Sequence, residues 1–270
     1  MFLKRFISGI ILVILSLLLI IQGGDILLFS TLLLSLVGTF ELNRALSIQS
    51  LAPSLEGYLM SIFYYMNLKY EWIDKPMVYS LIFLIILLTT YVVCYPNVHS
   101  KDIFTSFFGF FYVSVMLSFI YLTRMEEPNG KFLVWIIFLC AWGSDTFAYC
   151  VGRLFGKHKM TPILSPKKSI EGAIGGILGA AIINMIYVYF FINHFKVSNN
   201  FIWLIGVMAA IAAFVSMIGD LAASAIKRDN KVKDYGDLIP GHGGVLDRFD
   251  SIIITAPIIY FLTTLSMFIK

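Results

Sequence analysis

Residues 201–226 read FIWLIGVMAAIAAFVSMIGDLAASAI, an apolar run with few polar interruptions. About 20 such residues in a helix cross the hydrocarbon core of a bilayer, so this run is long enough to span a membrane. Similar runs recur along the whole chain of 270 residues, of which 59% are hydrophobic and only 13% charged. Soluble domains average about 25% charged residues. The sequence therefore predicts an all-α, polytopic integral membrane protein.

Nine apolar segments are predicted to form transmembrane helices. They are Phe6–Ile21, Ile26–Ala45, Leu55–Leu68, Met77–Tyr95, Ile103–Tyr121, Phe132–Val151, Ile170–Phe195, Phe201–Ile226 and Ser251–Ile269. The third is short for a bilayer and contains Glu56. The first resembles a signal peptide, but no small-residue cleavage site follows it, so we expect it to remain as the first span.

Positive charge is concentrated on one side of this predicted topology. The side that carries the N-terminus receives both basic loops of the C-terminal half, Gly152–Ser169 and Lys227–Arg248. By the positive-inside rule, this side is cytoplasmic. The formal net charge of +4 suits an anionic membrane surface and anionic substrates.

The chain becomes polar after the opening run, over Ser224–Ser251, which reads SAIKRDNKVKDYGDLIPGHGGVLDRFDS. Within it, Pro240–Gly244 forms a stiff turn with little side-chain bulk, so backbone N–H groups can approach a phosphate closely. Asp247 and Asp250 are three residues apart, so on a helix they share one face and can serve one metal site.

Two more carboxylates, Asp145 and Asp220, lie within predicted helices. A charge at membrane depth costs a few kcal/mol, so it usually faces a partner or a wet cavity. A helix end near the interface is the alternative for Asp145. Asp220 shares one helix face with Ser216, Ser224 and Lys227, which suggests the wall of a polar cavity.

The loop Gly152–Ser169 is strongly basic. Its last residues, Ser165–Ser169, precede a predicted helix whose N-terminal dipole also favours phosphate. A loop that merely obeys the positive-inside rule is the alternative. Small residues four apart between Gly172 and Gly179 predict that another helix packs closely against this one.

Carboxylates that can hold Mg²⁺, beside Lys and Arg that neutralise phosphates, are the parts of a phosphoryl- or nucleotidyl-transfer site. These parts gather in residues 131–270, so we expect this region to be catalytic and residues 1–130 to be mainly structural. The same parts also suit a transporter for a phosphorylated solute.

The polar stretch resembles the signature of the phosphatidate cytidylyltransferases, or CDP-diacylglycerol synthases. The matching positions are Ser224, Ile226, Lys227-Arg228, Lys233-Asp234, Pro240–Gly244 and Asp247-Arg248-Phe249-Asp250. Gly219-Asp220 and the segment from Ser165 to Gly172 also resemble the family.

This resemblance implies that CTP and phosphatidic acid give CDP-diacylglycerol and pyrophosphate, with Mg²⁺ and a possible second cation. It also implies a homodimer in the cytoplasmic membrane, surrounded by membrane lipids, with its active site facing the cytoplasm. No nucleic-acid partner is expected.

Site residues follow from this resemblance together with the chemistry. The expected metal ligands are Asp220 and Asp247, followed by Asp250 and Asp145. The expected catalytic residues are Asp220, Asp247, Asp250, Lys227, Arg228 and His242. The expected substrate-binding residues are Lys167, Lys168, Ser224, Gly243, Gly244 and Arg248.

Two other functions use similar parts. A CTP-dependent polyprenol or phytol kinase would phosphorylate a neutral alcohol, which requires a base to take the hydroxyl proton. A transporter would use Asp145 and Asp220 as ion sites. Transporters, however, usually show an internal repeat, and this sequence has no recognisable one.

Overall fold

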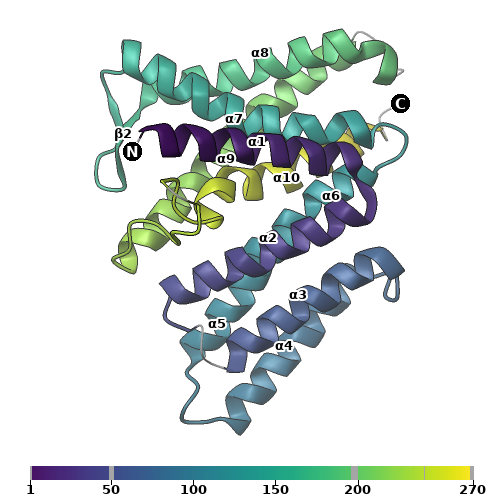
Figure 1. The fold of residues 1–270 in the computed structure, drawn as a ribbon, viewed down its shortest axis with the longest axis vertical. Helices are drawn as coiled ribbons and strands as arrows, with labels where there is room; N and C mark the ends of the chain where they lie inside the picture. Colours follow the sequence, from purple (N-terminus) through teal and green to yellow (C-terminus); the bar gives the residue numbers. More distant parts are fainter. Residues whose placement is uncertain (1, 49–51, 196–199, 240, 268–270) are drawn as a thin grey trace. The chain divides into compact units, whose positions relative to one another are not determined.

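A computed structural model describes residues 2–48, 52–195, 200–239 and 241–267 (Figure 1). The chain forms two compact units, one of residues 1–118 and 232–248 and the other of residues 119–231 and 249–270. We call them the first and the second unit. Pro240, within the predicted stiff turn, lies outside the described residues.

The first unit consists of N-terminal helices and the later segment 232–248. Its helices are α1 (Phe2–Gln22), α2 (Gly24–Ala45), α3 (Ala52–Tyr70), α4 (Pro76–Val93), α5 (Ser100–Gly109) and the π-helix η1 (Phe110–Val115). Helices α3 and α4 run side by side in Figure 1. The helix α6 (Met116–Met125) continues from η1 and enters the second unit.

Buried hydroxyl groups join three helices of the first unit. The Ser114 hydroxyl of η1 lies 2.9 Å from that of Ser35 in α2 and 2.7 Å from that of Ser61 in α3. The Tyr65 hydroxyl donates to the Ser114 carbonyl at 3.2 Å. A π-helical turn is rare within a helix. These hydroxyl contacts join η1 to α2 and α3.

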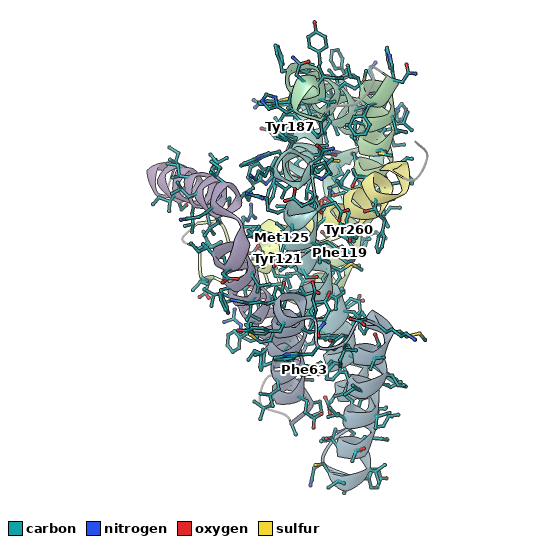
Figure 2. The ribbon with its side chains drawn as sticks, turned by 90° about the vertical axis from the view of Figure 1, so that its right-hand side faces the viewer. Phe63, Phe119, Tyr121, Met125, Tyr187 and Tyr260 are labelled. Atoms are coloured by element: carbon teal, nitrogen blue, oxygen red, sulfur yellow. The ribbon has the colours of Figure 1, made fainter. Side chains whose placement is uncertain are left out.

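The second unit contains the longest helices. They are α7 (Gly130–Phe155), α8 (Ile170–Phe195), α9 (Asn200–Asp229) and α10 (Leu246–Met267), whose first residues belong to the first unit. The strands β1 (Lys159–Thr161) and β2 (Ser165–Ser169) pair antiparallel between α7 and α8. Phe119 of α6 and Tyr260 of α10 lie together in Figure 2, with ring centroids 5.2 Å apart.

Helix α8 packs closely on α7 through its glycines. A Cβ atom on Gly176 would lie 2.8 Å from the Ser144 carbonyl oxygen, and one on Gly175 would overlap Val151. Only glycine permits this separation, which confirms that the small residues of α8 receive another helix.

Each predicted span coincides with helical structure, as far as the described residues reach, except that Met77–Tyr95 extends two residues beyond the end of α4 and Ile103–Tyr121 runs through α5, η1 and α6. Among those residues, five helices are long and apolar enough to cross a membrane: α2, the continuous segment Ser100–Met125, α7, α8 and α9. The fold is therefore that of an all-α membrane protein, apart from the short hairpin of β1 and β2 in the predicted basic loop.

Candidate active site

The second unit brings together carboxylates from three helices. Asp250 of α10 lies within electrostatic reach of Asp145 of α7 and of Asp220 and Lys227 of α9. The Asp145 carboxylate lies 3.5 Å from the hydroxyl of Ser251, the residue after Asp250. Three predicted metal ligands thus belong to one group, which we call the carboxylate cluster (Asp145, Asp220 and Asp250).

The basic hairpin, residues 157–169, supplies cations beside this cluster. Lys168 in β2 forms an ion pair with Asp220. A cavity of about 350 Å³ in the second unit is lined by Asp145, Arg153, Lys167 and Lys168. Arg153, Lys167 and Lys168 give this cavity positive side chains, which attract a phosphate-bearing ligand.

The hairpin is held in place by Glu171 in the first turn of α8. Its carboxylate accepts hydrogen bonds from the backbone N–H groups of Lys157, at 3.1 Å, and His158. Its Oε1 also lies 2.6 Å from Nδ1 of His158. Ser169 accepts a hydrogen bond from the Gly172 N–H through its side-chain oxygen, at 3.1 Å. The backbone is thus tied at the start of α8, while Lys167 and Lys168 extend toward the cavity.

The predicted polar stripe of α9 is present. Ser216 is buried and donates to the Ser251 carbonyl of α10 at 3.2 Å, whereas Ser224 and Lys227 are half-buried. Arg228, next along the chain, is exposed. The stripe therefore changes from a helix contact at Ser216 to more accessible side chains near the end of α9.

The first unit holds the Gly-rich loop, residues 232–248. Gly241 and Gly243 have φ values of 79° and 87°, which favour glycine because other residues are strained there. The Ile239 N–H donates to the Gly243 carbonyl at 2.9 Å, which closes the turn. His242 lies with Nδ1 2.9 Å from the Ser8 hydroxyl of α1.

Asp247 lies in the first turn of α10 and Asp250 three residues later, so the helix begins before the predicted span Ser251–Ile269. Their surroundings differ. Asp247 is only 6% exposed, and its Oδ2 accepts hydrogen bonds from the N–H groups of Tyr235 at 2.8 Å and Gly244 at 3.1 Å. Asp250 instead accepts from the Ser251 N–H at 2.8 Å. Asp247 thus organises the Gly-rich loop, whatever else it binds.

The predicted phosphate contacts of this loop remain predictions. The Gly244 N–H donates inside the loop, so a phosphate oxygen would have to replace that hydrogen bond. Arg248 is exposed at the start of α10.

Sequence reasoning missed two residues of α2 that hold this loop. Glu41 accepts hydrogen bonds from the N–H groups of Val245 and Leu246, and Arg44 donates to the Tyr235 carbonyl at 3.0 Å. Glu41 and Arg44 are three apart near the end of an apolar helix, and this polar pair was the available signal.

No preformed metal site is evident in the described parts of the chain. Among residues 2–48, 52–195, 200–239 and 241–267, no three His, Cys, Asp or Glu side chains gather closely enough to hold an ion. The donor chemistry nonetheless fits Mg²⁺, which prefers carboxylate oxygens, and the cluster joins three carboxylates from separate helices.

Comparison with known proteins gives consistent matches along nearly the whole chain. A family model described as the cytidylyltransferase family matches residues 3–266. A protein of Staphylococcus haemolyticus named phosphatidate cytidylyltransferase is 33% identical, over 94% of this chain and 96% of its own length. One of the same name from Bacillus subtilis is 31% identical, over 97% of both chains.

Proposed function

The chain belongs to the cytidylyltransferase family, and we infer from this that it makes CDP-diacylglycerol for phospholipid synthesis. It transfers the cytidylyl group of CTP to phosphatidic acid and releases pyrophosphate. The observation that carries this function is the match of the whole chain to phosphatidate cytidylyltransferases, together with a cationic cavity of about 350 Å³.

The reaction needs charge cancellation more than proton transfer. An oxygen of the lipid phosphate, already anionic, attacks the α-phosphorus of CTP, and the bond from that phosphorus to the bridging oxygen of pyrophosphate breaks. Two polyanions must therefore be brought together in line. Lys167 and Lys168, with Arg153 at the same cavity, would hold phosphate oxygens.

The other predicted cations have separate roles in this proposal. Lys227 would balance the carboxylate cluster and orient a phosphate, with Arg228 and Ser224 near the same end of α9. In the Gly-rich loop, the bond to Ser8 engages Nδ1 of His242, so a phosphate would meet Nε2. Gly243, Gly244 and Arg248 remain proposed phosphate contacts.

We propose Mg²⁺ as the cofactor, with Asp145, Asp220 and Asp250 as ligands. The support is that Asp145 and Asp220 both act electrostatically on Asp250 within one unit. Bound there, the ion would neutralise phosphate oxygens. Lys168 already pairs with Asp220, so an arriving cation would compete with its ammonium group. Asp247 stays a proposed ligand, and a second cation is also part of the proposal.

Labelled CTP tests the reaction. Purified protein in detergent receives phosphatidic acid, Mg²⁺ and CTP labelled at either the α- or the γ-phosphorus. We expect α-label in the lipid fraction and γ-label in pyrophosphate. Lipid labelled only from the γ-position would instead show a kinase.

The topology is proposed to contain nine spans, with both basic segments on the cytoplasmic side of the cell membrane. The support is a helix at every predicted span and the concentration of Lys and Arg in two loops. In a background without the native cysteines, Lys231→Cys should resist impermeant thiol reagents in intact cells, whereas Lys131→Cys should react. The opposite pattern would reverse the orientation.

We also propose that the protein forms a homodimer, and this part rests on the family resemblance alone. The mass of the detergent-solubilised protein, corrected for bound detergent, tests it, and a monomer mass at working concentration would count against it.

A further inference from the structure

Glu41 is a carboxylate buried in a membrane helix, and the reaction chemistry does not use it. It lies near the end of α2 and is only 3% exposed. An isolated carboxylate at such a place is costly, so its environment must compensate for the lost water. Its bonding partners show how.

The compensation comes from the Gly-rich loop. The Val245 N–H donates to Oε1 of Glu41 at 3.0 Å, and the Leu246 N–H donates to Oε2 at 2.8 Å. Leu246 is the first residue of α10. The first N–H groups of a helix have no partner within the helix, and its dipole favours negative charge there. Glu41 thus caps α10 with one carboxylate oxygen for each N–H.

Two glycines make room for this carboxylate. A Cβ atom on Gly236 or on Gly244 would overlap the Glu41 side chain, and one on Gly236 would also lie 3.0 Å from the Gly244 Cα. The loop backbone therefore approaches the Glu41 carboxylate closely at Gly236 and at Gly244. Glycine at both positions allows the approach.

Arg44, one turn further along α2, ties the other arm of the loop. It donates to the Tyr235 carbonyl at 3.0 Å, and Asp247 accepts from the N–H of the same residue at 2.8 Å. Side chains therefore fix backbone groups on both arms of the loop. At the start of α10, Glu41 makes this contact from α2, outside the loop.

We propose that Glu41 is the positioning residue of the Gly-rich loop: its carboxylate fixes residues 235–246 in the conformation that binds substrate. The structural part stands by itself, whereas the effect on catalysis depends on the proposed cytidylyl transfer. A residue of the N-terminal helices, predicted to be mainly structural, would then control how well the catalytic loop is ordered.

Three variants of the full-length protein in detergent test this role. Glu41→Ala removes both acceptors, and Glu41→Gln keeps one acceptor oxygen. Glu56→Gln is the matched control, since Glu56 is a half-buried carboxylate of α3 bonded to Thr90. The readouts are amide hydrogen exchange of peptides covering residues 235–248, and kcat and KM for CTP.

We expect loop exchange to rise in the order wild type, Glu41→Gln, Glu41→Ala. We expect kcat/KM for CTP to fall at least tenfold in Glu41→Ala and less in Glu41→Gln, with Glu56→Gln unchanged in both readouts. Unchanged loop exchange in Glu41→Ala would overturn the proposal, even if activity fell. Faster exchange with unchanged kinetics would overturn its catalytic part. If the wild type failed to transfer the cytidylyl group, exchange would still test the loop contact.

Gly244→Ala alone covers the case in which Glu41→Ala does not fold, and the double variant tests the coupling of the two positions when it does. Gly244→Ala places a methyl group against the Glu41 carboxylate, so it should also raise loop exchange. In Glu41→Ala/Gly244→Ala the obstructing carboxylate is gone, so the added effect of Gly244→Ala should shrink. Wild-type exchange in Gly244→Ala alone would contradict the close contact between Gly244 and the Glu41 carboxylate, and so would fully additive effects of the two substitutions.

Discussion

The two polar segments of this membrane protein are held in different ways. The basic hairpin is tied by Glu171, a carboxylate near the protein surface, and its Lys167 and Lys168 side chains line a cavity. The Gly-rich loop is tied by Glu41 and Asp247, which are almost fully buried, and its own N–H groups are the ones engaged. The first segment presents side chains to a ligand, whereas the second depends on a fixed backbone.

This difference separates two kinds of acidic residue that look alike in sequence. Asp220 is partly exposed and interacts with Lys168 and with the Asp250 carboxylate, so its charge is available for chemistry. Asp247 accepts two backbone hydrogen bonds, so its removal must disturb the loop. Variants at these two positions should therefore fail in different ways.

Asp220→Asn should have the largest effect on activity. It removes a negative charge at nearly constant volume, and the half-buried position tolerates an amide. We expect turnover to be abolished while the protein still elutes as one sharp peak in gel filtration. Retention of more than about a tenth of wild-type activity, a loss of under about 1.4 kcal/mol, would exclude an essential ligand.

Asp247→Ala should lower stability as well as activity. It leaves the buried N–H groups of Tyr235 and Gly244 without their acceptor, which costs about 1–3 kcal/mol for each group. We expect a clearly lower thermal unfolding temperature in detergent.

The matched control for this variant is Asp237→Ala. Asp237 is in the same loop but 97% exposed, with a 3.8 Å pair to Arg44, so its removal should have little effect. Equal unfolding temperatures for the two variants would remove the distinction between buried and exposed loop carboxylates.

Sequence reasoning predicted the fold well because its signals were local. Long apolar runs mark helices, and the glycines of α8 mark a close helix contact, which Gly176 makes with the Ser144 carbonyl. The hairpin in the basic loop was missed, since its residues include Pro and Lys, which are uncommon in strands.

The sequence singled out the residues of the carboxylate cluster but not how the chain arranges them. Asp145 and Asp220 stand out because charges are unusual within apolar helices, Asp250 stands out for its spacing from Asp247, and Asp145 and Asp220 both act on Asp250 in the second unit. The attachment of Glu41 to Val245 joins residues 204 positions apart, and no local pattern encodes such a pairing. The same limit applies to Ser8 and His242.

Glu171→Ala should have the smallest effect. Glu171 accepts backbone N–H groups of Lys157 and His158 where water can replace it, unlike the buried amides around Asp247. Interactions between exposed charged groups contribute about 0.2–1 kcal/mol, which corresponds to at most about a fivefold change. We therefore expect the KM for CTP to rise by no more than about fivefold, with kcat and the unfolding temperature nearly unchanged.

Because salt screens exposed charges, the contribution of the pair between Glu171 and His158 should weaken as ionic strength rises, so the variant and the wild type should converge in KM. A loss of well over tenfold in kcat/KM would mean that the hairpin depends on its carboxylate as strongly as the Gly-rich loop does, and the contrast between the two segments would fail.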